Sequence, residues 1–181
     1  MESHAVKVSY LDASALVKLV ADDPDEEPGR TAIREYYWQN TSHKTTSLCV
    51  VEALSAFKLK FLRKKISRDE YVGYVKTLTR TVVGHLTIDE MPVLSPNYVG
   101  QRTIDEISDL SKLLREAETL MNKYGLDFID CVQIVTILHG KFSLWCGDSK
   151  SILITADREL AEVARAEGAR VWECTSEPSP P

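Results

Sequence analysis

The chain has 181 residues and a formal net charge of −5, with 44% hydrophobic and 27% charged residues. These values are typical of a globular protein, and the length suits one domain with a substantial core, which we place at residues 1–175. The negative charge argues against nucleic-acid binding by bulk attraction and leaves any such contact to local basic patches.

No apolar run approaches the roughly 20 residues that span a bilayer, and residues 1–4 do not begin a basic segment followed by an apolar one. We therefore expect a cytoplasmic protein with no membrane partner. The cysteines are scattered, without a Cys-x-x-Cys pair, so we expect isolated thiols and neither a disulfide framework nor a zinc site. They are Cys49, Cys131, Cys146 and Cys174.

Short apolar runs alternate with amphipathic segments along the first half of the chain. We predict a strand at 6–11, a short extended segment or helix entry at 45–47, and a third strand at 85–88. Helices are predicted at 14–20, 31–40, 48–63 and 67–84, the last opened by the capping box of Ser67 and Glu70. A loop with two prolines and five acidic residues fills 22–29.

The second half continues the alternation. Residues 90–100 predict a proline-bearing loop, and 102–123 a long amphipathic helix that stops before Gly125. Asp127 can cap a helix ending at Gly140. A strand at 151–155, a helix at 158–167, a strand at 170–172 and a disordered tail at 176–181 complete the chain.

Strands that alternate with helices predict an α/β fold with a parallel sheet covered on both faces. In such sheets, ligands bind beyond the carboxyl ends of the strands. Asp12 and Asp157 each follow a predicted strand directly. Both side chains should therefore lie at the same edge of the sheet.

Four carboxylates stand next to core-forming residues, where an ionised group costs several kcal/mol unless it is paired or bound to a metal. They are Asp12, Glu52, Asp130 and Asp157. Lys18 and Arg158 are the basic residues within these segments, so local ion pairs cannot account for all four acids. A shared divalent cation can.

Each acid also has a structural explanation. Asp12 and Asp157 could be N-caps of the helices that follow them, and Asp130 could be an N-terminal acid of a helix capped by Asp127. Glu52 is harder to explain in this way, because its neighbours in the sequence are nearly all apolar.

Convergence of the four acids would favour metal-assisted chemistry. Two carboxylates about 4 Å apart repel by roughly 4 kcal/mol at an effective dielectric of 20. Such a cluster becomes favourable around Mg²⁺ or Mn²⁺, which prefer oxygen ligands. One or two such ions could orient a phosphodiester and activate a water.

The stretches 8–16, 46–53, 126–134 and 152–160, in this order, resemble the four acidic motifs of PIN-domain ribonucleases. The resemblance extends from about residue 6 to residue 172. It implies a three-layer α/β/α sandwich with a central parallel sheet and Mg²⁺- or Mn²⁺-dependent cleavage of RNA. By matching motif, the catalytic and metal-binding role passes to Asp12, Glu52, Asp130 and Asp157.

Ser14 and Thr155 would be supporting ligands or donors in the same motifs, and Asp127 is a fifth acid that we interpret as a helix cap. The resemblance also extends to VapC-type toxins of toxin–antitoxin pairs, which are usually dimeric and are inhibited by an antitoxin protein. It therefore implies a homodimer and an antitoxin partner as further expectations.

Basic residues cluster after residue 57 and could contact the RNA backbone or form a solvated helix end. The candidates for RNA contact are Lys58, Arg63, Lys64 and Lys65, with Lys60 and Arg68 nearby. The functional alternative to an endoribonuclease is a catalytically degenerate PIN-type scaffold or binding module. A phosphatase with an aspartyl nucleophile is disfavoured, because Ser14 stands where a second aspartate is usual.

Overall fold

The computed structural model describes residues 8–22, 24–40, 42–89, 104–139 and 151–180. In this part of the chain, five parallel strands form one sheet in the order β3-β2-β1-β4-β5. The strands are β1 (Ser9–Leu11), β2 (His43–Thr46), β3 (Thr87–Asp89), β4 (Ile152–Thr155) and β5 (Val171–Glu173). The predicted loop at 90–100 lies outside the described residues.

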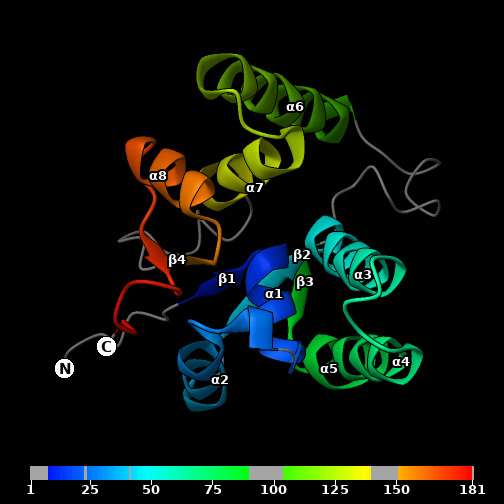
Figure 1. Cartoon of the computed structure of the whole chain (residues 1–181). Coiled ribbons are helices and arrows are strands. Elements are labelled where there is room, and N and C mark those ends of the chain that lie inside the picture. Colours follow the sequence, from blue (N-terminus) through cyan, green and yellow to red (C-terminus); the bar gives the residue numbers. More distant parts are fainter. Residues whose placement is uncertain (1–7, 23, 41, 90–103, 140–150, 181) are drawn as a thin grey trace.

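Helices cover both faces of this sheet (Figure 1). One face carries α1 (Ala13–Val20), α2 (Arg30–Gln39), α3 (Ser47–Leu62), α4 (Arg68–Thr77) and α5 (Val83–His85). The other face carries α6 (Ile104–Tyr124), α7 (Phe128–His139) and α8 (Arg158–Ala166). The predicted α/β/α sandwich is thus the observed architecture.

The two cores follow from the alternation of side chains along each strand. Leu11 and Ile154 pack into the core under α1, α2 and α3. Tyr10 and Leu153, their neighbours along β1 and β4, pack into the opposite core with α6, α7 and α8. Because both faces are covered, β1 and β4 bury apolar side chains on both sides, as is typical of a parallel sheet.

Two predicted elements differ from the observed ones. The short extended segment at 45–47 is the end of a full strand, β2, whose polar residues are stabilised by pairing with β1 and β3. Thr45 is fully buried, and its hydroxyl donates to the carbonyl of Leu11 at 2.8 Å. The helix at 67–84 is divided, because a π-helical turn, η2 (Leu78–Val82), separates α4 from α5.

The start of the predicted disordered tail is anchored to the domain. Trp172 Nε1 donates to the carbonyl of Glu177 at 3.1 Å, and Arg165 pairs with the Glu177 carboxylate at 2.6 Å. Cys49, Cys131 and Cys174 are free thiols, whereas Cys146 lies outside the described residues. Within the described ranges, no helix is long and apolar enough to cross a membrane.

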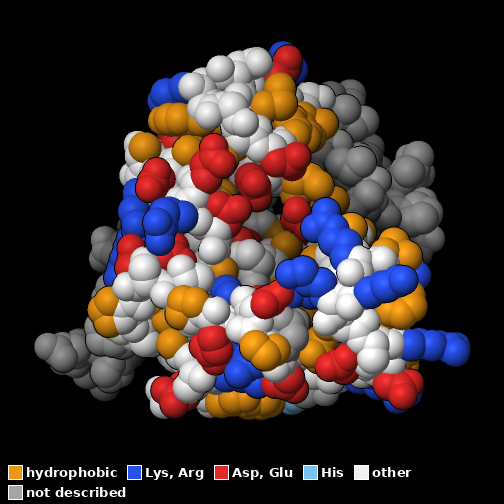
Figure 2. All heavy atoms as spheres, in the orientation of Figure 1, with side chains coloured by type: hydrophobic (Ala, Val, Ile, Leu, Met, Phe, Trp, Pro, Cys, Tyr) orange, Lys and Arg blue, Asp and Glu red, His pale blue; other side chains and the backbone are white. Residues whose placement is uncertain are grey.

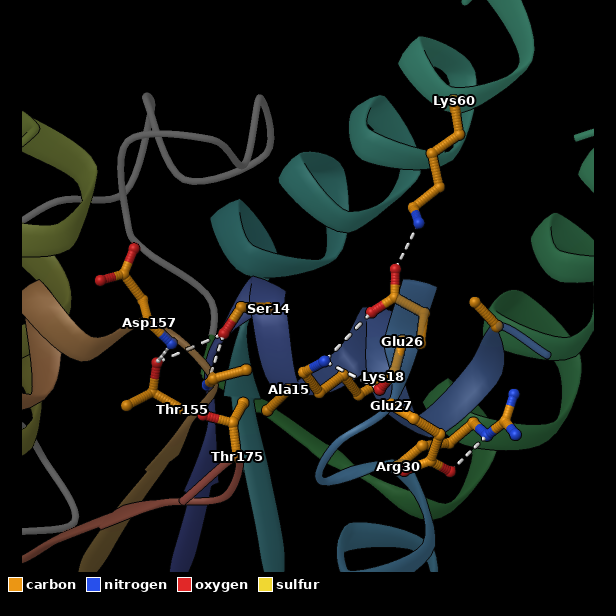
Figure 3. Close-up of polar contacts among 12 residues, drawn as sticks. Ser14, Ala15, Lys18, Glu26, Glu27, Arg30, Lys60, Thr155, Asp157 and Thr175 are labelled. Atoms are coloured by element: carbon orange, nitrogen blue, oxygen red, sulfur yellow. Dashed lines mark hydrogen bonds and ion pairs between the residues drawn. The ribbon is translucent and has the colours of Figure 1, made fainter. Parts of the chain in front are cut away.

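A buried ion cluster connects the helices on the first face. Glu26 of the 3₁₀ helix η1 (Pro24–Glu26) is paired with Lys18 of α1 and with Lys60 of α3 (Figure 3). The Lys18 ammonium also donates to the Glu26 carbonyl at 2.9 Å. Because this cluster fixes α3 against α1, it also helps to place the functional residues on those helices.

Glu26→Gln should destabilise the fold, because it removes the negative charge between two lysines whose side chains are 10% and 19% exposed. Loss of one partner from a buried ion pair costs about 3 kcal/mol or more. Urea unfolding measures this change in the free energy of unfolding. Glu27→Gln is the control: the Glu27 side chain is 39% exposed, against 10% for Glu26, so the loss should stay below about 1 kcal/mol. Equal effects of the two substitutions would contradict the expectation.

Candidate functional site

Asp12 lies at the carboxyl end of the central strand β1 and is 4% exposed. It is the N-cap of α1, because its Oδ1 accepts from the backbone N–H of Ala15 at 2.7 Å. Its carboxylate also accepts from Ser14 Oγ at 2.9 Å and from Thr155 Oγ1 at 2.6 Å. The capping interpretation is therefore correct, and the same carboxylate belongs to a wider polar network.

Ser14 and Thr155 connect the ends of the neighbouring strands β1 and β4 (Figure 3). Ser14 Oγ accepts from the backbone N–H of Ala156 at 2.7 Å while it donates to Asp12. Thr155 Oγ1 in turn accepts from the backbone N–H of Asp157 at 2.9 Å. The two hydroxyls thus hold the Asp12 carboxylate in place and link it to the turn that carries Asp157.

Asp157 is exposed at the rim of the same edge. Its Oδ1 accepts from the backbone N–H of Leu160 at 3.0 Å, so it caps α8 as the sequence suggested. The other carboxylate oxygen is not used by the cap. In Figure 3 the Asp157 side chain extends away from the sheet, beyond Thr155.

Glu52 and Asp130 reach the same edge from helices α3 and α7, and both are half-buried. Burial, followed by the negative charge of Glu52, raises the pKa of Asp130 to about 7, with further contributions from Asp12 and Asp157. Burial also raises the pKa of Glu52, assisted by Asp127 and Asp157. The Asp130 carboxyl group therefore lies within the electrostatic field of the other three acids.

Burial raises the pKa of Asp12 to about 6, although its hydrogen bonds to Thr155, Ala15 and Ser14 act in the opposite direction. Lys18, the first basic residue after Asp12 in the sequence, forms an ion pair with Glu26. In the described part of the chain, no lysine or arginine forms an ion pair with any of the four acids.

The acids form a graded set, with Asp12 at the floor, Glu52 and Asp130 half-buried, and Asp157 and Asp127 exposed. Figure 2 shows acidic side chains around a hollow between α7 and α3, with lysine and arginine side chains over α3 beside it. Among the described residues, no three carboxylate, histidine or cysteine side chains converge closely enough to hold a metal ion in their present positions. Asp127 is a helix cap, since its Oδ1 accepts from the N–H of Ile129 at 2.8 Å.

Some side chains of the predicted basic cluster contact other described residues, and others form no ion pair with a described residue. Lys60 is bound to the buried Glu26, and Lys65 is paired with Asp25 at 2.9 Å. The Lys58 ammonium lies 5.1 Å from the ring centroid of Phe61. Arg63 and Lys64 are exposed, and neither forms an ion pair with a described residue.

A second polar network lies beside the acids and has no clear signal in the sequence. Thr46 Oγ1 donates to Cys49 Sγ at 3.1 Å, and Cys49 Sγ donates to Gln133 Oε1. Burial raises the pKa of the Cys49 thiol to about 12, and the charges of Asp12 and Glu52 act in the same direction. The thiol is therefore a hydrogen-bond donor at neutral pH. Gln133, a polar residue inside the apolar run of α7, was the available hint.

Comparison with solved structures finds a protein of similar fold. The chain is similar to PAE2754 from Pyrobaculum aerophilum, with a TM-score of 0.54 and 18% sequence identity. The match covers 92% of this chain and 90% of that chain. No protein-family model matches the sequence, and no curated protein matches it. At this identity the likeness concerns the α/β fold alone.

Asp130→Asn should stabilise the metal-free protein at pH 8 and leave its stability unchanged near pH 3.5. The raised pKa of Asp130 means that the folded state holds its proton more tightly than the unfolded state does. The protonated Asp130 carboxyl group therefore contributes to the free energy of unfolding. This contribution is fully present below about pH 3.8 and is lost as the pH rises through about 7. Asparagine does not ionise, so the variant does not lose stability as the pH rises. At pH 8 its free energy of unfolding should exceed that of the wild type by on the order of 1 kcal/mol after allowance for solvent screening.

Thermal unfolding in the presence of a chelator measures this difference at the two pH values. The exposed Glu162 of α8 provides the control, because Glu162→Gln removes a carboxylate that has no hydrogen bond or ion pair to a described residue. A gain of the same size at both pH values would show that repulsion among the acids is not its source.

Proposed function

We propose that the protein is a metal-dependent endoribonuclease whose active site contains Asp12, Glu52, Asp130 and Asp157. The observation that carries the proposal is the burial of Asp12 beside three electrostatically coupled acids, with no described lysine or arginine in an ion pair with any of them. Such an arrangement is unfavourable in isolation and becomes favourable with a bound cation. The PIN-like fold supports the choice of reaction.

The donor set suits Mg²⁺ or Mn²⁺, because carboxylate and hydroxyl oxygens are hard ligands and no histidine belongs to the set. Asp12, Glu52, Asp130 and Asp157 would hold the ion. When bound, the ion would supply an activated water and polarise the phosphodiester.

The residues of the chain contribute orientation. Ser14 and Thr155 direct two hydroxyl hydrogens at Asp12, which limits the positions that its oxygens can take. Capping by Asp12 and Asp157 fixes both side chains on the first turns of α1 and α8. Half-buried Glu52 and Asp130 can still adjust their side chains, which would allow the four carboxylates to close around an ion.

The RNA would approach over α3, where Figure 2 shows basic side chains next to the acidic hollow. Arg63 and Lys64 are the strongest candidates for backbone contact, because they are exposed and form no ion pair with a described residue. Lys58 and Lys65 would first have to leave the Phe61 ring and Asp25.

Asp12→Asn and Asp157→Asn should each lower Mn²⁺-dependent RNA cleavage by at least about 100-fold, because each removes a charged ligand. Asparagine is a good N-cap, so both variants should keep the fold. The assay measures single-turnover cleavage of a fluorescent RNA with and without Mn²⁺, and circular dichroism reports the fold.

The matched control is Asp69→Asn, which changes an exposed aspartate in the first turn of α4. Wild-type rates in the Asp12 and Asp157 variants would overturn the site. Failure of the wild-type protein to bind Mn²⁺ at millimolar concentration would favour the non-catalytic scaffold.

We further propose that a second copy of the chain packs on the outer face of α3. Val51, Leu59 and Leu62 lie on this face and are 58%, 45% and 63% exposed. An antiparallel pair of these helices would bury the apolar residues of both copies.

Leu59→Glu should therefore convert the dimer to a monomer, as measured by light scattering during gel filtration. Val72→Glu, at another exposed apolar position on α4, should leave the mass unchanged. A wild-type protein that is monomeric at micromolar concentration would contradict this proposal.

A further inference from the structure

Gln133 of α7 is 4% exposed and has one unused hydrogen-bonding group. Its Oε1 accepts from the thiol of Cys49 on α3. Its Nε2 is buried and has no hydrogen-bond partner among the described residues. A buried donor without a partner lowers the stability of the fold, so a purely structural role does not explain this amide.

The position of the amide relates it to the candidate site. Gln133 follows Asp130 by three residues on α7, and Cys49 precedes Glu52 by three residues on α3. Residues three apart are neighbours on a helix surface. Because Cys49 and Gln133 are in contact, the junction of α3 and α7 carries the Glu52 and Asp130 carboxylates one turn away. The effect of Glu52 on Asp130 is consistent with that placement.

Two neighbouring hydroxyl groups, those of Thr136 and Thr46, already have hydrogen-bond partners. Thr136, three residues further along α7, donates to the carbonyl of Val132 at 2.8 Å. Thr46 Oγ1 serves the first turn of α3, where it accepts from the Cys49 N–H at 3.2 Å. The Cys49 thiol donates to Gln133 Oε1, so Nε2 is the atom of the amide that can still bind another partner.

We propose that Gln133 is a positioning residue for the acid centre, and that its Nε2 donates to the Glu52–Asp130 carboxylate pair when a divalent cation is bound. The inference rests on the proposed metal-dependent function. A carboxylate that binds an ion commonly uses its remaining lone pairs to accept a hydrogen bond from a neighbouring donor, which orients it. Cys49 contributes by fixing which end of the amide faces the acids.

The test compares Gln133→Met with Thr136→Val in the full chain. Methionine keeps the length of the side chain and removes the donor, whereas Thr136→Val removes a buried hydroxyl of the same helix that bonds only to its own backbone. Calorimetric titration gives the affinity for Mn²⁺, and urea unfolding with a chelator gives the stability of the metal-free protein.

We expect Gln133→Met to weaken Mn²⁺ binding by about 10-fold or more, the usual effect of removing a donor behind a metal ligand. The metal-free variant should be as stable as the wild type or more stable, since a buried unpaired donor has been removed. Cys49→Ala, which frees the amide to rotate, should weaken binding by a smaller factor. Thr136→Val should bind Mn²⁺ as the wild type does.

Wild-type affinity in Gln133→Met would overturn this inference and leave the proposed function intact. Loss of the metal-free fold in Gln133→Met would also overturn it, because Gln133 would then have a structural role. Absence of Mn²⁺ binding by the wild-type protein would instead overturn the proposed function, and this inference with it.

Discussion

The parallel arrangement of the five described strands is the constraint on which the rest of the structure depends. All carboxyl ends lie at one edge, so the turns from β1 to α1 and from β4 to α8 are side by side. Both turns need an N-cap, and an aspartate is a good one. Asp12 and Asp157 therefore become neighbours as a consequence of ordinary helix capping, and the site needs acids from only two further helices.

The same geometry makes the site costly for the fold. Asp12 is removed from solvent and receives hydrogen bonds from hydroxyl and amide groups, yet its pKa is still raised. The hydrogen bonds from these neutral donors lower the pKa of Asp12 by less than burial raises it. The adjacent Asp130 is affected in the same direction by burial and by the other acids. The buried acids lower the stability of the fold at the carboxyl edge of the sheet, and a bound cation would raise it again. Groups with shifted pKa values are often found at functional sites.

Much of this arrangement could be predicted from the sequence because it rests on local patterns. The apolar runs of β1 and β4, the caps Asp12 and Asp157, and the capping box at Ser67 are each read over a few residues. The parallel sheet follows from the alternation of strands and helices. The convergence of Glu52 and Asp130 needed a family resemblance as well, because their helices are far apart in the chain.

The features that could not be predicted depend on contacts between distant segments. From the sequence, Lys60 belongs to a basic surface, but its pairing with Glu26 of η1, 34 residues earlier, makes it a buried structural group. The polar strand β2 is stable only because β1 and β3 pair with it. Nothing near Gln133 in the sequence indicates that Cys49, 84 residues away, will occupy its oxygen.

Helix α3 shows how these distant contacts could serve the site. Its carboxyl-terminal half is fixed to α1 through Lys60 and Glu26, and its first turn is fixed to α7 through Cys49 and Gln133. Glu52 lies between these two attachments. A helix held at both ends cannot slide or rotate freely, so the backbone of Glu52 is placed while its side chain remains free to move. In this fold, long-range pairs outside the set of four acids determine where Glu52 stands.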